Sequence, residues 1–279
     1  MQRRSFKLLR WYINFNDNQQ CDGSPDRFYK ICPLFDMFRQ QCLLISSTYQ
    51  HSVDEAMVVF KGTKAGSLRW YIANTPDKWS FKLFCRASSS GIIHGLLLCQ
   101  GASTFFIVAL TQEEELLLGA KLVTTLCKTI TLPRLSVVCD NYFTSFDLVQ
   151  NMQENLGIGC IGTQCLSSVK RWRKDRCPMP IAHAYNQHMG GLDLSEMLVH
   201  MYKTLAKSRQ WYLPLFGYIL DLCISNAWLV YKRDCSLLKE TLLPFKRFRL
   251  AVAHTLAQVS KPASKVGRPS SSSSPPHMS

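Results

Sequence analysis

The order of predicted elements between residues 79 and 152 constrains the fold more than any other feature of the sequence. Short β-prone runs come first, separated by Ser- and Gly-rich turns, which predicts an antiparallel meander. Gln112–Thr129 follows with leucines at helical spacing after an acidic start, and Leu135–Cys139 is typical of a buried strand. The β-prone runs are Phe81–Arg86, Ile92–Cys99 and Thr104–Leu110.

A carboxylate, Asp140, lies where the predicted strand ends and the next helix begins. Thr144-Ser-Phe-Asp147 has a capping-box pattern, which predicts a helix through Leu148–Met152. Ligands in open α/β sheets collect outside the carboxyl ends of strands, so Asp140 is well placed to hold a metal ion or a phosphate. The alternative is an aspartate that hydrogen-bonds its own loop, and position alone favours this alternative.

A second pair of carboxylates follows the turn at Gly190-Gly191. Asp193 and Glu196 are three residues apart, so on a helix that begins at this turn they share one face. Two carboxylates on one face could share a divalent cation. The alternative, which is better without further evidence, is that they are first-turn acids favoured by the helix dipole.

The composition is that of a basic chain with enough apolar residues for a core. Lys and Arg number 33 against 19 Asp and Glu, so the net charge is +14, which favours polyanionic partners and nucleic acid first. A solubilising basic surface would give the same charge. The apolar share of 47% in 279 residues permits one sizeable domain or two modest ones.

Targeting and metal signals are few. Met1–Arg10 carries cations without an apolar run, so no signal peptide is predicted and an intracellular protein is favoured. Leu213–Tyr231 is apolar but contains Asp221 and Asn226, which predicts a buried helix and not a membrane span. The 12 cysteines are scattered without a C-x-x-C pair, so we expect reduced core thiols and no structural zinc site.

Five short motifs follow one another along the chain. They are Val53-Asp-Glu-Ala-Met with Phe60-Lys-Gly, then Tyr71–Trp79, Cys139-Asp-Asn-Tyr-Phe-Thr-Ser, Tyr185-Asn-Gln-His-Met-Gly-Gly-Leu-Asp, and Ser208-Arg-Gln-Trp-Tyr. In this order they resemble the successive motifs of piggyBac transposases, from about Arg10 to Tyr231. Chance does not readily place five motifs in the order of one family.

The resemblance implies an α/β fold with an RNase H-like core, in which helices flank a mixed central sheet. It also implies that acidic residues bind divalent metal, expected to be two Mg²⁺ ions, and drive DNA strand cleavage and transfer. Asp140 matches the second catalytic aspartate and Asp193 the third, both as metal ligands. Glu196 matches a nearby acidic position that is usually Asp.

The resemblance places the first catalytic aspartate on the opening strand, for which Lys82–Gly95 is the expected segment. Alignment puts Ser88 at that position, or Ala87 with a different gap, and no Asp occurs from Lys78 to Cys139. A serine hydroxyl is a weak neutral ligand for Mg²⁺. We therefore expect a badly impaired two-metal site.

Comparison with the family pattern also predicts missing parts. Asp140 and Asp193 are 193 − 140 = 53 residues apart, which implies an incomplete, shortened insertion subdomain near 160–180. The family's N-terminal DNA-binding region and cysteine-rich zinc module are expected to be absent. The expected domains are 1–50, a remnant of the N-terminal helical region; 51–232, the RNase H-like domain; 233–259, a helical extension; and 260–279, a disordered Ser/Pro-rich tail.

Basic clusters interleaved with aromatic residues are the predicted DNA contacts, because phosphate binding and base stacking require this pattern. The first cluster also resembles a nuclear localisation signal, and Gly267-Arg268-Pro269 resembles the core of an AT-hook. A solvated basic face and a plain flexible tail are the alternatives. The predicted contacts are Lys170, Arg171, Trp172, Arg173, Lys174 and Arg176, then Lys203, Lys207 and Arg209 with Trp211 and Tyr212, and Arg268.

Three functions follow from these observations. The first is a nuclear, DNA-associated protein domesticated from a transposase and lacking efficient strand transfer. The second is an active metal-dependent transposase or nuclease, which would need another acid in place of Ser88. The third is a degenerate fragment without molecular activity. The expected partners are DNA and a second copy of the chain, with no membrane.

Overall fold

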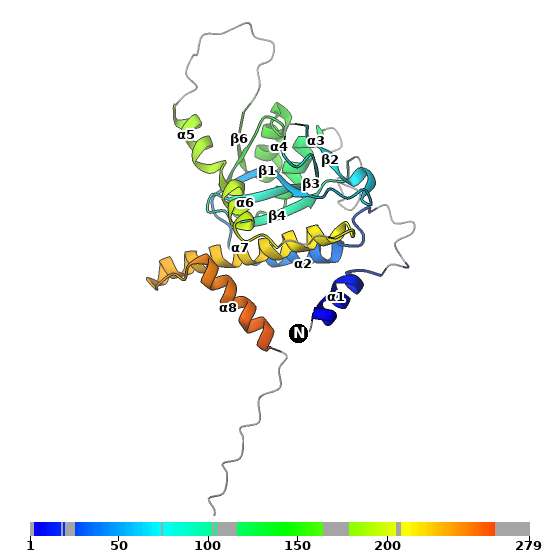
Figure 1. The fold of residues 1–279 in the computed structure, drawn as a ribbon. Helices are drawn as coiled ribbons and strands as arrows, with labels where there is room; N and C mark the ends of the chain where they lie inside the picture. Colours follow the sequence, from blue (N-terminus) through cyan, green and yellow to red (C-terminus); the bar gives the residue numbers. More distant parts are fainter. Residues whose placement is uncertain are drawn as a thin grey trace, which may run out of the picture. The chain divides into compact units, whose positions relative to one another are not determined.

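The computed structural model describes residues 3–17, 19, 26–73, 75–101, 104, 116–163, 179–204 and 208–259 (Figure 1). The chain divides into two compact units, Met1–Asp234 and Cys235–Ser279. The first unit holds the sheet. The described strands are β1 (Gln50–Val59), β2 (Trp70–Tyr71), β3 (Trp79–Ser88), β4 (Ile93–Leu98), β5 (Ser136–Cys139) and β6 (Gly159–Gly162).

The sheet is mixed, and β1 lies at its centre. β1 pairs antiparallel with β3 on one side and parallel with β5 on the other, and β6 continues the sheet parallel to β5. The outer edge of β3 pairs with β2 near its start and with β4 nearer its end. The order is therefore β2 and β4, then β3, β1, β5 and β6. This arrangement confirms the expected α/β class with a mixed central sheet.

Helices cover both faces of this sheet. The described helices are α1 (Arg3–Tyr12), α2 (Cys32–Leu43), α3 (Leu118–Cys127), α4 (Phe146–Leu156), α5 (Met179–His188), α6 (Gly191–Met201), α7 (Tyr212–Leu238) and, in the second unit, α8 (Phe245–Gln258).

Two hydrophobic clusters fill the space between the sheet and the helices. Residues of α2, α6 and α7 pack on one face, and residues of α3 and α4 pack on the other (Figure 1). The alternation of β3 explains the two clusters, because Leu83 and Cys85 join the first and Phe84 joins the second. Burial on both faces accounts for the apolar character of the central strands.

The apolar segment near residue 220 forms a core helix. Of the described helices, α7 is the one long and apolar enough to cross a membrane by length and composition, and 56% of its most apolar window is buried in the protein. Its Leu215, Ile219 and Leu222 belong to the first cluster and are essentially inaccessible. The apolar face of α7 is thus used in packing against the sheet, as predicted.

Most predicted elements are observed. β3 and β4 cover two of the three β-prone runs, and β5 ends at Cys139 as predicted. The predicted helix within Gln112–Thr129 begins at Leu118. The third β-prone run beyond Thr104, the acidic residues Glu113–Glu115 and the tail 260–279 lie outside the described residues. The 9 cysteines that the structure describes are free thiols, most of them buried.

The helix after Asp140 starts one residue later than its capping-box pattern predicts. Ser145 is the N-cap of α4, and its hydroxyl accepts a hydrogen bond of 3.1 Å from the backbone N–H of Leu148. Thr144 instead donates its hydroxyl to the carbonyl oxygen of Asp140 at 2.7 Å. The Thr144 side chain therefore tightens the loop after β5 and does not cap the helix.

A buried amide joins α7 to the start of β4. Asn226 accepts a hydrogen bond from the Ile93 backbone N–H at 2.9 Å and donates one to the Ile93 carbonyl at 2.8 Å. We expect Asn226→Ala to lower the free energy of unfolding by about 2–4 kcal/mol, because each unsatisfied buried group costs roughly 1–3 kcal/mol. Urea denaturation measures this loss. Gln150→Ala, on the exposed side of α4, is the control, and equal losses in both variants would contradict the assignment.

Candidate functional site

The parallel pairing of β1 with β5 brings two aspartates together. Val53 lies opposite Cys139 in this pairing. One residue further along each strand are Asp54 and Asp140, at the carboxyl end of β5. Side chains of neighbouring residues in register project from the same face of a sheet. Asp54 and Asp140 therefore belong to one acidic site.

The carboxylates of Asp140 and Asp193 act on the pKa of Asp54. The pKa of Asp54 is raised from 3.8 to about 6, chiefly by burial and also by the negative charges of Glu55, Asp140 and Asp193, while a hydrogen bond from the Glu55 backbone opposes the rise. That hydrogen bond, from the Glu55 N–H to Asp54 Oδ1, measures 2.8 Å. Two negative charges therefore act on the Asp54 carboxyl group, one from Asp140 after β5 and one from Asp193 on α6.

A glycine allows α6 to carry Asp193 to this site. α6 contacts both β1 and β3. A methyl group at Gly191 would collide with the carbonyl oxygen of Ser88 and press on the Ser52 hydroxyl, so this close approach requires glycine. Asp193 follows two residues later, in the first turn of α6, where its side chain is exposed.

The carboxylate of Glu196 has its own partners on α6 and α7. It accepts a hydrogen bond of 2.6 Å from the hydroxyl of Tyr218 on α7, and His200 Nδ1 lies 3.7 Å from its other carboxylate oxygen. Burial raises the pKa of Glu196, and the Tyr218 hydroxyl, His200 and Lys203 oppose that rise. The convergence of Asp140, Asp193 and Glu196 on one cation stays a prediction: Asp140 and Asp193 act on the pKa of Asp54, and Asp193 also acts on the pKa of Glu196.

Ser88 does not lie on the strand that opens the sheet. That strand is β1, and the segment expected to open it, Lys82–Gly95, instead contributes most of β3 and the start of β4. Ser88 is fully buried at the end of β3, where its hydroxyl lies 2.9 Å from that of Ser90. Its position beneath Gly191 gives it a packing role. The sequence signal that points to Asp54 is the Val53–Met57 motif, which was not assigned to the opening strand.

The donor atoms of the acidic site suit a hard cation. Asp54, Asp140 and Asp193 offer carboxylate oxygens, the ligands that Mg²⁺ prefers. In the part of the chain that the structure describes, no three His, Cys, Asp or Glu side chains are grouped tightly enough to ligate one ion together. Mg²⁺ retains several waters and is commonly held by one or two carboxylates, so the two adjacent strand aspartates fit it.

Two of the predicted DNA-contacting cations fall within the described residues. Lys203 lines a pocket of about 520 Å³ next to Tyr218, and Arg209 lines another of about 760 Å³. Ser208 borders both pockets, so they adjoin. The predicted contacts that lie outside the described residues are Lys170, Arg171, Trp172, Arg173, Lys174, Arg176, Lys207 and Arg268.

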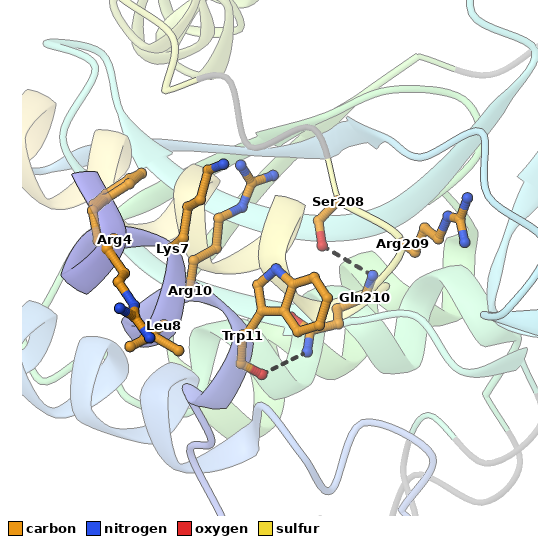
Figure 2. Close-up of a pocket in the computed structure, with 9 residues that line it drawn as sticks. Arg4, Lys7, Leu8, Arg10, Trp11, Ser208, Arg209 and Gln210 are labelled. Carbon is orange, nitrogen blue, oxygen red and sulfur yellow. Dashed lines mark hydrogen bonds between the residues drawn. The ribbon is translucent and has the colours of Figure 1, made fainter.

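The pocket at Arg209 is a basic groove formed with α1. Figure 2 shows Arg4, Lys7 and Arg10 of α1 along one side and Arg209 on the other. Trp11 also lines the groove and is 74% exposed. We call these five residues the α1 groove. The cations at positions 4, 7 and 10 share one helix face by their spacing, and this pattern in the sequence could have revealed the groove.

Contacts with the body of the protein hold the α1 groove in place. Gln210 Nε2 donates to the Trp11 carbonyl at 3.2 Å, and the Tyr212 hydroxyl donates to the Ile13 carbonyl at 3.2 Å (Figure 2 shows the first). The expected stacking role of Trp211 and Tyr212 is not supported. Trp211 packs against Phe28 with ring centroids 5.8 Å apart, and Tyr212 is buried.

Comparison with sequence families and curated proteins agrees with this geometry. The family described as Transposase IS4 matches residues 1–165 and 163–228. The human PiggyBac transposable element-derived protein 2 is 21% identical over 321 residues, covering 89% of this chain and 51% of that protein. The human PiggyBac transposable element-derived protein 3 is 21% identical over 301 residues, covering 83% and 48%. The chain spans about half the length of these relatives.

Comparison with solved structures places the fold. The cryo-EM structure of a piggyBac transposase synaptic complex with hairpin DNA superposes with a TM-score of 0.80 at 18% identity. The match covers 95% of this chain and 66% of the other. The mixed sheet with flanking helices is therefore RNase H-like, as the motifs implied.

The raised pKa of Asp54 predicts a specific pH dependence. The folded state holds this proton up to about pH 6 and the unfolded state only to about 3.8, so stability falls as the pH rises through this interval. Asp54→Asn should remove that part of the pH dependence, because the amide does not titrate. Thermal unfolding from pH 4 to 7 tests it. Asp147→Asn on α4 should retain the wild-type profile, and an unchanged profile in Asp54→Asn would refute the assignment.

Proposed function

This chain belongs to the piggyBac transposase family, described as Transposase IS4, and we propose that it binds DNA and cleaves it with metal at the acidic site. One observation carries the proposal. Asp54 on β1 lies beside Asp140, which follows β5, and the charges of Asp140 and Asp193 both act on the pKa of Asp54. We infer that Asp54 takes the first catalytic position, Asp140 the second and Asp193 the third.

With Asp54 as the first ligand, Ser88 leaves no gap in the acidic set. Ser88 ends β3, the second long strand of the sheet, whereas Asp54 lies on the opening strand β1. With Asp54 in that role, every position of the acidic set carries a carboxylate. Glu196 accepts a hydrogen bond from Tyr218 on α7 and would then link α6 to α7 without binding the ion.

The carboxylates of the acidic site are suited to binding cations. Asp54 and Asp140 would hold Mg²⁺, and Asp193 would complete the field of negative charge. Mg²⁺ bound there would polarise a phosphodiester and activate the attacking hydroxyl. Because the pKa of Asp54 is about 6, its carboxylate is mostly ionised at neutral pH and can bind a cation in competition with a proton. The Thr144 and Tyr142 contacts to Asp140 fix the loop that carries the second ligand.

A second candidate is DNA association without strand transfer in a domesticated, nuclear protein. The α1 groove favours it, because cations and an exposed indole suit phosphate contact and stacking without any requirement for chemistry. The net charge of +14 and the short interval between Asp140 and Asp193 agree with it. Both candidates include DNA as partner, and they differ only in whether the acidic site cleaves it.

A plasmid-nicking assay with Mg²⁺ or Mn²⁺ separates the two candidates. We expect metal-dependent nicking by the wild type that falls in Asp54→Asn and in Asp140→Asn. A loss of several kcal/mol of transition-state stabilisation corresponds to roughly a hundredfold or more in rate. Ser88→Ala and Glu196→Gln should retain nicking. Wild-type protein that binds DNA but never nicks it would instead establish the second candidate.

Binding of labelled duplex DNA across a salt series tests the α1 groove. Arg10→Gln and Arg209→Gln should each weaken binding and reduce the slope of log affinity against log salt by about 0.9, the value for one lost phosphate contact. Lys64→Gln, an exposed cation outside the groove, is the matched control and should keep the wild-type slope. Equal slopes in all four proteins would place the DNA elsewhere.

A further inference from the structure

Within the residues that the structure describes, a buried arginine on β3 has no carboxylate partner. Arg86 is 1% exposed and is the largest fully buried side chain among the described residues. The groups that act on its pKa are burial, which lowers it, and the thiols of Cys127 and Cys42, which raise it. An arginine keeps its proton under these conditions, so its positive charge persists. Removing one charge of a buried pair is strongly destabilising, and a buried guanidinium ordinarily has an anionic partner.

The polar contacts that Arg86 does make are with neutral groups. Its Nη2 donates to the Thr129 hydroxyl at 3.0 Å, and Nη1 lies 3.4 Å from His51 Nδ1. His51 Nε2 donates to the Thr48 carbonyl at 3.0 Å, which leaves Nδ1 as a lone-pair acceptor and the imidazole neutral. Arg86 Nε has no hydrogen-bond partner in the described structure. The guanidinium thus retains donor capacity that these groups do not use.

The second histidine near Arg86 also carries an unused polar atom. His94 is 2% exposed, and its ring lies 4.8 Å from that of His51, centroid to centroid. Its Nε2 is buried and has no hydrogen-bond partner in the described structure. Burial, together with the positive charges of Arg86 and Arg233, lowers the pKa of His94 to about 4. The surroundings of this cluster are therefore cationic.

Arg86 and His94 line a cavity of about 380 Å³. The cavity lies between the segment that follows α2 and the segment that follows α3. Its other polar side chains are hydroxyls and the thiol of Cys42, and a guanidinium, an imidazole and hydroxyl groups are the donors that surround oxyanions. The hydroxyls belong to Ser46, Ser47, Thr129 and Thr131.

We propose that this cavity binds a tetrahedral oxyanion of the phosphate class, with Arg86 as its buried anchor. The ligand would be inorganic phosphate or the terminal phosphate of a nucleotide or DNA end. An internal phosphodiester carries a sugar on each side and is a poor fit for a guanidinium buried at the base of a pocket. Arg86 and His94 both line the cavity, so an anion bound there would lie beside an otherwise uncompensated positive charge.

The oxyanion site is separate from the acidic site. Arg86 and His51 project from the same face as Phe84 and Val53, which pack with α3 and α4, whereas Asp54 projects from the face of α6. Neither Asp54 nor Asp140 is among the groups that act on the pKa of Arg86. The proposal therefore stands whether or not the acidic site cleaves DNA.

Thermal unfolding and calorimetry with inorganic phosphate, against chloride at equal ionic strength, test the site in the full chain. We expect phosphate to bind and to raise the Tm of the wild type and of Lys64→Gln. Arg86→Met keeps an apolar stem of similar length and removes the unpaired charge, and it should lower phosphate affinity roughly tenfold or more. No phosphate effect in the wild type, or an equal effect in Arg86→Met, overturns the proposal.

An exposed position gives a second variant that does not depend on replacing a buried residue. Thr131 lines the cavity and is exposed, so Thr131→Glu places a carboxylate at its mouth without disturbing the core. This variant should have a higher Tm than the wild type in chloride and should lose the response to phosphate. A full phosphate response in Thr131→Glu would contradict binding in this cavity.

Two oligonucleotides distinguish the sources of the phosphate. A short single strand with a 5′-phosphate and the same strand without it are titrated into wild type and Arg86→Met. Preference for the phosphorylated strand, lost in Arg86→Met, identifies a nucleic-acid end as ligand. Equal binding of both strands, with inorganic phosphate still raising the Tm, identifies the free ion. Asp54→Asn should leave the phosphate response unchanged, which keeps this test apart from that of the proposed function.

Discussion

The register between β1 and β5 is the constraint on which the acidic site depends. Val53 opposite Cys139 places Asp54 next to Asp140, and a slip of one residue would turn one of the two carboxylates to the other face of the sheet. Apolar packing on both faces of β1 opposes such a slip, since Val53 belongs to one hydrophobic cluster and Ala56 to the other. The core therefore holds two carboxylates next to each other despite their mutual repulsion.

Much of the fold could be predicted from residue patterns, but the first strand could not. β5, α4 and α6 carry clear signals, because their apolar spacing and turn residues agree with the structure they adopt. β1 contains Asp54 and Glu55 at its middle, residues that are unfavourable in strands, so local propensity hides it. Pairing on both sides with β3 and β5 overrides that propensity. The site residue on β1 was missed for the same reason.

The same physical reasoning explains why aromatic residues near basic clusters were misassigned. Trp211 and Trp11 both neighbour cations in sequence, yet Trp211 packs against Phe28 and Trp11 is exposed in the α1 groove. Sequence spacing shows that an aromatic and a cation are close, but not which side of the backbone faces the core. Only tertiary contacts, such as that of Trp211 with Phe28, decide that question.

Asp54 on β1 and Arg86 on β3 carry opposite charges on opposite faces of the sheet, at neighbouring positions of the β1–β3 pairing. Val53 is opposite Arg86 in the antiparallel register, so the residue next to Asp54 is the neighbour of the buried guanidinium. The sheet separates these charges, because side chains alternate between faces and each charge is surrounded by different helices. An anion at Arg86 would thus neutralise a buried cation without entering the acidic site. A cation at Asp54 and Asp140 would do the converse on the other face, so each site can be filled by its own ion.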